Sequence, residues 1–516
     1  MTYEQLKSFL PSSASIQGDE IRCRVETAEF APLVETLVNG QSVPLSLVYA
    51  TDDRKSQDQF GIHAVLSLEE SQWLLISTFV PAQSPEYPAL TKSVMAAHWY
   101  ERYLQDMFGI TPEGHPDPRR LVHHENIPEG THPLRKDFAW DTKLDHASVP
   151  YPMHHVRGEG ICEIPVGPIH AGIIEPGHFR FNVAGERIIT LEGKLFFTHK
   201  GVEKLLEDKT PLEALPFIER LSGDMAASHA LAFCQAIEKI SGTQVPARAQ
   251  ALRVALCELE RLTMHIHDLA NIAGMGTAYT LMAANGFRVK ERLVRLSEKL
   301  FGNRFWRGAI VPGGVTRDWS AGELRLVKET AKGAVEEMQK LICMAMQSDG
   351  LRERLETSGV LKRDAAIAYG ALGLPARASG VLRDVRVDHP YAAYDQHPFE
   401  LVHAVDGDVY ARYQCRVGEL AVSLKLLEEV VGMHVGDPVH SGVSLKDGSG
   451  VGAVESWRGE ILTVVHLKDG KIERCMPRDP SFCNWPLFGE IGPGNIVPDF
   501  PLCNKSLNLS YSGTDM

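Results

Sequence analysis

The chain has 516 residues, more than one ordinary hydrophobic core accommodates, so we expect at least two domains. Its composition, 44% hydrophobic and 23% charged, is that of a soluble globular protein, and a net charge of −13 argues against nucleic acid as the main partner, because phosphate binding requires basic patches. No run of about 18 apolar residues is present, so no transmembrane segment is expected. The first residues lack the basic start and apolar core of a signal peptide, which predicts a cytoplasmic location.

Nine cysteines are scattered along the chain without a Cys-x-x-Cys pair. An odd number of isolated cysteines fits neither a disulfide framework nor an iron–sulfur site. We therefore expect reduced thiols.

Residues 1–138 predict a mixed α/β domain. Three short apolar or alternating runs bounded by turn residues predict neighbouring antiparallel strands at 44–50, 61–68 and 73–80. A helical pattern follows Pro88.

Three charged segments follow, at 101–110, 114–121 and 132–138. Together they resemble the signature of the 30-kilodalton subunit of respiratory complex I. The resemblance implies structural roles for the charged residues, with arginine–carboxylate pairs at a subunit junction. The polar, turn-rich stretch 139–160 is interpreted as a linker.

A second domain, 161–516, opens with strand-like runs at 179–183 and 187–191, separated by a hairpin signal. With the flanking residues 164–170 and 175–181, these runs resemble the N-terminal hairpin of hydrogenase large subunits and of the 49-kilodalton subunit of complex I. In the latter, the loop matching His170 reaches into the quinone cavity. His170 is therefore a candidate proton donor or ligand-binding residue, with a satisfied loop histidine as the alternative, and Glu175 and His178 are candidates for a shared proton path.

Long helices are predicted over 200–242, 247–273 and 318–358, with apolar stripes typical of core packing. His265 and His267 are two residues apart and face different sides of their helix, so joint metal binding is not expected. The glycine-rich stretch 448–452 lacks the strand before and helix after that a nucleotide-binding loop requires.

Two motifs carry the chemistry. Residues 220–229 resemble the Arg-x-Cys-Gly-x-Cys-x-x-x-His motif of the nickel–iron hydrogenase large subunit, and residues 508–516 resemble the Asp-Pro-Cys-x-x-Cys motif near its C-terminus. The cysteines of both motifs are absent; the positions that would supply metal ligands hold Ser222, Met225, Ser510 and Gly513. Because soft thiolates suit nickel and low-spin iron far better than a hydroxyl or thioether, the sequence predicts a hydrogenase scaffold whose own metal centre is missing.

The same resemblance assigns further positions around the cavity. Residues 454–460 resemble a motif whose arginine lies over the open metal position, so Arg458 is a candidate cavity-facing charge, with a structural ion pair as the alternative. Complex I has a quinone-binding tyrosine at the position of Gly223, and its absence argues against quinone reduction by that geometry. The positions expected to line the cavity are Arg220, Gly223, Asp224 and His229.

The predicted fold is α+β: a mixed domain similar to the complex I 30-kilodalton subunit, followed by a mainly helical domain similar to the hydrogenase large subunit. The resemblance implies a catalytic-type subunit of an energy-converting hydrogenase-related complex, peripheral on the inner face of the cell membrane. The implied partners are an iron–sulfur small subunit, which carries the clusters, and antiporter-like membrane subunits, with quinone as a candidate ligand. The chain ends at Met516 without the extension that nickel-loaded relatives commonly lose on maturation, as expected if no nickel is inserted.

Two alternatives remain open. The chain could be an NADH–quinone oxidoreductase subunit that contributes a quinone-binding cavity. It could also be a structural docking subunit that retains the fold as a bridge, in which case Arg458, His170 and Glu175 would all be replaceable by alanine.

Overall fold

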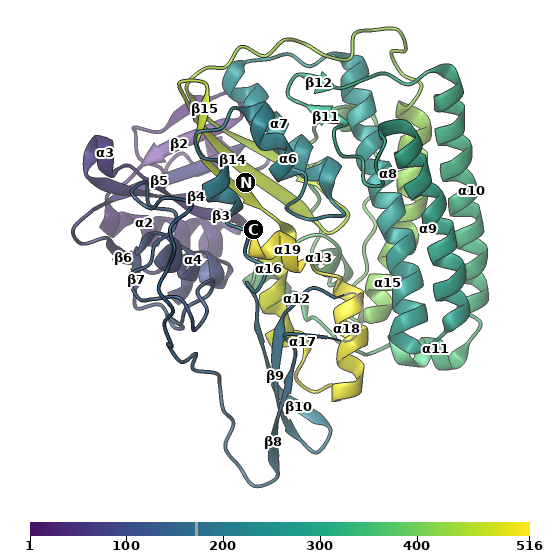
Figure 1. Ribbon diagram of the computed structural model, residues 1–516, viewed down its shortest axis with the longest axis horizontal. Helices are drawn as coiled ribbons and strands as arrows, with labels where there is room; N and C mark the ends of the chain where they lie inside the picture. The colour runs from purple at the N-terminus through teal and green to yellow at the C-terminus, as the bar shows by residue number, and fades with distance from the viewer. Residues whose placement is uncertain (171–173) are drawn as a thin grey trace.

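The computed structural model describes residues 1–170 and 174–516 (Figure 1). A sheet formed by the N-terminal part of the chain lies on one side, and long helices lie on the other. Between them sits a second sheet, β13–β14–β15, and a three-stranded ribbon extends away below it. The fold is α+β, as predicted.

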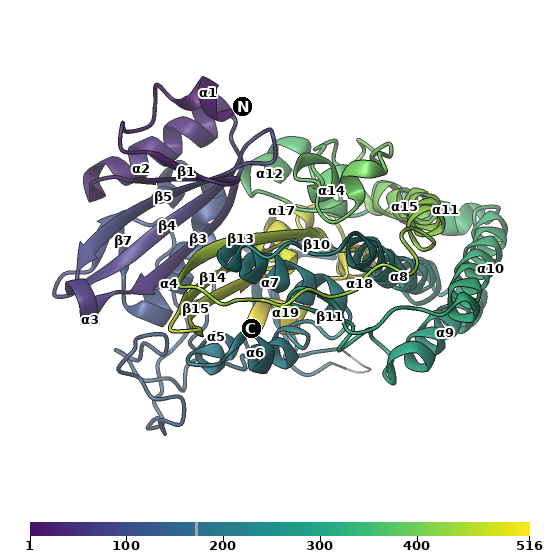
Figure 2. The same cartoon turned by 90° about the horizontal axis from the view of Figure 1, so that it is seen from above.

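The N-terminal sheet has the strand order β1-β2-β5-β4-β3. The predicted antiparallel pairing of three neighbouring strands is confirmed, since β4 pairs antiparallel with both β3 and β5. The parallel pairing of β2 with β5 was not foreseen, because β2 mixes charged and apolar residues. In Figure 2, α2 lies above this sheet and α4 below it. These elements are β1 (Ser15–Gln17), β2 (Glu20–Arg24), β3 (Leu45–Asp52), β4 (Gln59–Ser67), β5 (Trp73–Pro81), α2 (Thr27–Glu35) and α4 (His98–Phe108).

The helix predicted after Pro88 starts later than its apolar pattern suggests. The segment before α4 forms two 3-10 turns, because the buried Glu101 carboxylate accepts the backbone N–H groups of Leu90 and Thr91 at 2.7 and 2.9 Å. Glu101 therefore ties the entry segment to the helix it precedes.

The three-stranded ribbon contains the predicted hairpin, β9 (His178–Ala184) and β10 (Arg187–Lys194), which pair antiparallel. Its third strand, β8 (Ile161–Val166), pairs with β9 and was not predicted. Residues 114–160 carry no helix or strand, which is compatible with the predicted linker at 139–160. The boundaries at 138 and 160 stay a prediction.

The single helix predicted over 200–242 is wrong in extent. Thr210 and Glu213 form a capping box that starts a new helix at Pro211, and residues 219–225 leave the helical path. The prediction over 318–358 is likewise split, because Ser348 caps a second helix. The observed helices are α5 (Val202–Leu206), α6 (Pro211–Ile218), α7 (Ala226–Ser241), α8 (Ala247–Asn271), α9 (Thr280–Phe301), α10 (Ala321–Ala345), α11 (Asp349–Leu355) and α15 (Val409–Val430).

Helix α8 lies at the centre of the helical part, packed against α9 and α15 (Figure 1). Helix α7 packs closely on the second sheet: a Cβ atom at Gly452 would lie 1.9 Å from the carbonyl oxygen of Ala232. The stretch 448–452 lies within strand β13 (Gly448–Glu455), so it is not a nucleotide-binding loop between a strand and a helix. The sheet strands are β13 (Gly448–Glu455), β14 (Glu460–Lys468) and β15 (Lys471–Arg478).

The remaining elements are short. They include α1 (Tyr3–Leu6), α3 (Arg54–Gln57), β6 (Glu86–Pro88), β7 (Thr111–Glu113), β11 (Ile310–Val311), β12 (Gly314–Val315), α12 (Arg363–Ala368), α13 (Leu374–Ala378), α14 (Val385–Asp388), α16 (Pro480–Asn484), α17 (Phe488–Ile491), α18 (Phe500–Leu507) and α19 (Tyr511–Asp515). The C-terminal helices α16 to α19 gather at the centre of the molecule, where the chain ends (Figure 1).

Candidate functional site

The two motifs meet at one buried point. The hydroxyl oxygens of Ser222 and Ser510 lie 3.0 Å apart, although the residues are 288 positions apart in the chain. The Ser512 hydroxyl donates to the carbonyl oxygen of Leu221 at 2.8 Å. Ser222 is 0% exposed and Ser510 6%, so the tertiary structure brings together two of the four positions that the resemblance assigned to metal ligands.

Local sequence signals position both segments. Helix α7 begins just after Met225, and the Glu260 carboxylate on α8 accepts its first free N–H groups, from Ala227 at 2.8 Å and Ser228 at 3.2 Å. Ser510 caps α19, because its hydroxyl oxygen accepts the N–H of Gly513 at 2.9 Å. Ser510 thus has a helix-capping role at a position where a metal ligand would stand.

Arg458 reaches this point from the turn between β13 and β14. Its guanidinium donates to both carboxylate oxygens of Asp224, at 2.6 and 2.9 Å, and to the Ser222 hydroxyl at 3.3 Å. It also stacks 3.9 Å over the Trp457 ring. Burial alone would raise the pKa of Asp224, but the Arg458 guanidinium beside it holds that pKa below its usual range. Arg458 therefore lies beside Ser222 as half of a bidentate ion pair with Asp224, and a cavity-facing role stays a prediction.

Asp479 completes the group and was missed by the sequence interpretation. Its Oδ2 lies 3.1 Å from Nε2 of the buried His229. Although burial opposes ionisation, the hydrogen bond from His229 lowers the pKa of Asp479. The signal available in the sequence was the Asp479-Pro480 pair directly after a strand, which marks a helix cap.

The residues at the four ligand positions do not fit a nickel–iron group. Two offer hydroxyls that are already hydrogen-bonded, and Met225 packs in an apolar cluster with Met264 and Trp457. Gly513 has no room for a side chain, since a Cβ atom there would lie 2.3 Å from Oδ2 of Asp479. Within residues 1–170 and 174–516, no three His, Cys, Asp or Glu side chains are arranged to hold a metal ion.

The other predicted cavity positions separate into buried and exposed ones. His229 lies inside, beside Asp479. Arg220 is exposed, and its guanidinium donates to the carbonyl oxygen of Pro216 at 2.6 Å. Gly223 is exposed as well. Arg220 is therefore not part of the hydrogen-bonded group around Ser222, because its side chain binds the end of α6.

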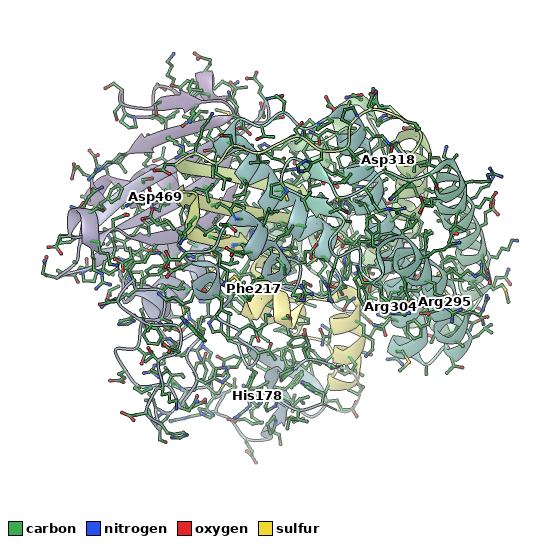
Figure 3. The ribbon with its side chains drawn as sticks, turned by 45° about the horizontal axis from the view of Figure 1, so that its top comes forward. His178, Phe217, Arg295, Arg304, Asp318 and Asp469 are labelled. Carbon is green, nitrogen blue, oxygen red and sulfur yellow. The ribbon has the colours of Figure 1, made fainter. Side chains whose placement is uncertain are left out.

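The hairpin candidates lie on the ribbon, where Figure 3 labels His178. His170 Nε2 lies 2.8 Å from the carbonyl oxygen of Gly177, and His178 Nδ1 lies 3.2 Å from that of Gly167. The exposed Glu175 accepts the N–H of Ser512 at 3.0 Å. The structure thus joins Glu175 to the C-terminal segment, while the two histidines bind backbone of their own ribbon. A proton path shared by Glu175 and His178 stays a prediction.

All nine cysteines are free, as predicted, and six of them are buried: Cys23, Cys234, Cys257, Cys415, Cys475 and Cys503. In the described part of the chain, no helix combines the length and apolar character needed to cross a membrane.

Comparison with known proteins defines the class. Residues 23–143 match the family model of the respiratory-chain NADH dehydrogenase 30 Kd subunit, and residues 275–441 match that of the 49 Kd subunit. The chain is 33% identical to formate hydrogenlyase subunit 5 of Escherichia coli, over 96% of this chain and 89% of that protein. It is 34% identical to hydrogenase-4 component G of the same organism, over 91% and 83% of the two chains. It is also 30% identical to the C/D subunit of NADH-quinone oxidoreductase from Bacteroides fragilis, over 73% and 75%.

The fold and these matches define the chain as an oxidoreductase subunit in which 30 Kd-like and 49 Kd-like regions are fused. It is related both to complex I and to hydrogenases. More narrowly, the chain belongs to the family of group 4 hydrogenase large subunits that includes formate hydrogenlyase subunit 5 and hydrogenase-4 component G. This is a family of membrane-associated, energy-converting oxidoreductases, and its members are subunits of larger assemblies.

Proposed function

We propose that this chain is the hydrogenase-like large subunit of an energy-converting complex, and that it works without a nickel–iron centre of its own. In this proposal an iron–sulfur small subunit delivers electrons to this chain. Antiporter-like membrane subunits couple that electron transfer to ion translocation. Within that complex this chain would sit peripherally on the inner face of the cell membrane, with residues 1–138 and 161–516 as its own two complex I-like domains.

One observation carries the proposal: the group that fills the ligand positions is already satisfied. Ser222 and Ser510 bind each other, and Arg458 is neutralised by Asp224. A thiolate centre needs four soft anionic donors, and none of these groups supplies one. What remains is a buried polar site with an arginine–carboxylate pair, suited to sensing or stabilising charge rather than to ligating nickel.

The test is metal analysis by mass spectrometry on the complex purified with its native small subunit, together with extraction for bound quinone. Iron in the amount expected for the partner's clusters, without nickel, supports the proposal. Stoichiometric nickel would overturn it. Recovered quinone would identify what the site serves.

The second candidate is a quinone-reducing subunit, favoured by the likeness to the C/D subunits of NADH-quinone oxidoreductases. This candidate requires that quinone binds without the tyrosine hydroxyl found in complex I, because position 223 of this chain is glycine. The third candidate, a docking subunit, is tested by alanine at Arg458, His170 and Glu175. Full function of the assembled complex with all three replaced would support docking, and severe loss in a well-assembled complex would exclude it.

A further inference from the structure

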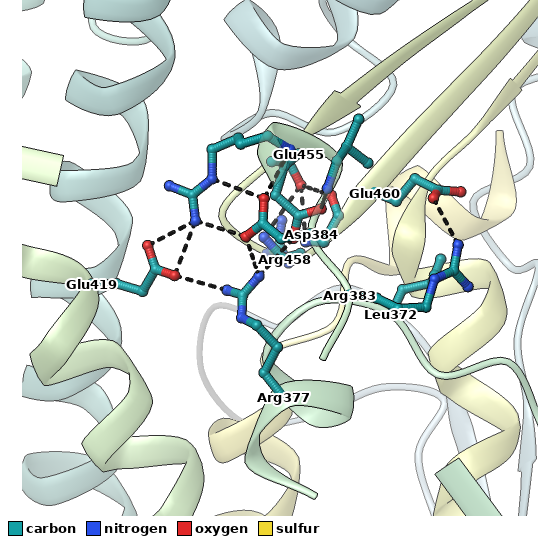
Figure 4. Close-up of polar contacts among 12 residues, drawn as sticks. Leu372, Arg377, Arg383, Asp384, Glu419, Glu455, Arg458 and Glu460 are labelled. Carbon is teal, nitrogen blue, oxygen red and sulfur yellow. Dashed lines mark hydrogen bonds and ion pairs between the residues drawn. The ribbon is translucent and has the colours of Figure 1, made fainter. Parts of the chain in front are cut away.

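A cluster of buried ion pairs lies behind the turn that carries Arg458. It joins three arginines to four carboxylates through contacts of 2.6 to 3.4 Å. Figure 4 labels four of its members, Arg377, Asp384, Glu419 and Glu455. Every member's side chain is at most 2% exposed. We call these residues the ion cluster: Arg261, Arg377, Arg386, Glu258, Asp384, Glu419 and Glu455.

The ion cluster has one carboxylate more than it has guanidinium groups. If all members were ionised, a net negative charge would remain among buried side chains, and such a charge is costly. No further arginine or lysine in the described chain forms an ion pair with these four carboxylates. The excess is removed most directly by one proton bound to one of the carboxylates.

The contacts single out Glu455 as the proton-binding member. Asp384, Glu419 and Glu258 each contact two arginines, whereas Glu455 contacts one guanidinium within the described residues, that of Arg377 at 3.0 Å. In the described part of the chain, its other oxygen accepts only the backbone N–H of Val385, at 3.2 Å.

The pKa directions agree with this geometry. Burial, and then the neighbouring Asp384 carboxylate, raise the pKa of Glu455 to about 8. Burial also opposes ionisation of Glu419, but Arg386 and Arg377 lower its pKa. The charged and titratable groups facing Glu455 are Arg377 from α13, Asp384 and Arg386 from α14, Glu258 and Arg261 from α8, Glu419 from α15, and Tyr391.

Backbone contacts place Glu455 between a cleft and the turn that carries Arg458. Its backbone N–H donates to the Tyr391 hydroxyl at 3.1 Å, and Tyr391 lines a cleft of about 1000 Å³ between the N-terminal sheet and β13. Ala453, two residues earlier on the same strand, lines that cleft too. On the other side, Arg261 donates to the Ser456 carbonyl oxygen at 2.8 Å within the turn that leads to Arg458.

We propose that Glu455 is a buried proton-binding residue that exchanges one proton with the cleft and so sets the charge of the ion cluster behind Arg458. On uptake an O–H bond of a hydronium ion in the cleft breaks as one O–H bond forms on the carboxylate, and on release that bond breaks and the proton returns to water. No electron moves. The proposal goes beyond the function proposed above and holds whether or not nickel or quinone is found.

Infrared spectroscopy of the full-length chain, in its native complex, tests this directly. The C=O stretch of protonated carboxyl groups is recorded between about pH 6 and pH 10, in H₂O and D₂O, for the wild type and Glu455→Gln. We expect a component that titrates near pH 8 in the wild type and is missing from Glu455→Gln. The control Glu291→Gln, which removes an ionised surface carboxylate, should keep it.

The same component in wild type and Glu455→Gln would overturn the proposal, as would its absence from the wild type. Glutamine has the shape of the protonated side chain, so the variant should fold. Failure of Glu455→Gln to fold would therefore also contradict the proposal, because it would show that the fold requires the ionised form.

Discussion

Replacing Arg386 with methionine is the most informative test of the ion cluster. The guanidinium of Arg386 contacts Asp384 at 2.8 Å, Glu419 at 3.0 Å and Glu258 at 3.4 Å. Its removal leaves four carboxylates with two arginines in a buried site. Breaking a buried pair by removing one partner costs about 3–5 kcal/mol, because the remaining charge loses its compensation. We expect the free energy of unfolding to fall by that amount near neutral pH.

The matched control is Arg304→Met. Arg304 forms an ion pair with Glu291 at 2.6 Å, comparable in length, but its side chain is 46% exposed and it lies in the turn after α9, on the helical side of the molecule (Figure 3). Exposed pairs of this kind contribute about 0–1 kcal/mol, so this variant should unfold almost as the wild type does.

Urea unfolding followed by far-ultraviolet circular dichroism measures the difference as a shift of the transition midpoint. Adding Glu419→Gln to Arg386→Met removes one of the four carboxylates, lowers the excess of negative charge and should recover part of the loss. Equal midpoints for Arg386→Met and Arg304→Met would refute the reasoning. A double variant less stable than the single one would do so as well, because it would show that charge imbalance is not the cause.

Four further outcomes are expected. Gly513→Cys should lower the thermal unfolding temperature, because its Cβ atom would meet Asp479 at 2.3 Å, and restoring all four cysteines should not restore hydrogen turnover; hydrogen evolution by the four-cysteine variant would contradict this. Gly452→Ala should cost on the order of 3 kcal/mol, since α7 cannot withdraw from a 1.9 Å contact without unpacking the sheet, and a urea midpoint equal to that of the wild type would show that it can. Because the pKa of Glu455 is raised from 4.5 to about 8, its protonation stabilises the folded state below pH 4.5, and this stabilisation is lost as the pH rises through 8. Between pH 4.5 and pH 8 the free energy of unfolding of the wild type should fall by up to about 1.4 kcal/mol per pH unit. The free energy of unfolding of Glu455→Gln should depend less on pH.

Local patterns in the sequence determined much of the architecture. The three apolar runs between 44 and 80 became antiparallel strands, and the glycine turn at 184–186 closed the predicted hairpin, because alternation and turn residues act over a few neighbours. Capping residues also mark the helix starts near Pro211 and Ser348 in the sequence. The longer apolar stripes favoured single continuous helices instead.

Residue identities alone likewise show that the four cysteines of the two motifs are absent. What surrounds them was decided by tertiary contacts. Sequence could place Arg458 over the site, but only the fold shows that Asp224 neutralises it, and that Asp479 closes the space beside Gly513. These contacts join segments far apart in the chain, and no local pattern encodes them.

The ion cluster shows the same limit most clearly. Helical periodicity assigns apolar residues to the core and charged residues to the surface. Three buried charged residues depart from that rule: Glu258 and Arg261 on α8, and Glu419 on α15. A charged side chain on a buried helix face indicates an ion-pair partner within the chain. Which residue is that partner depends on how α8, α14 and α15 pack. Whether those charges balance, and so whether Glu455 binds a proton, is a property of the assembled core, because the cost of an unpaired charge arises only once water is excluded.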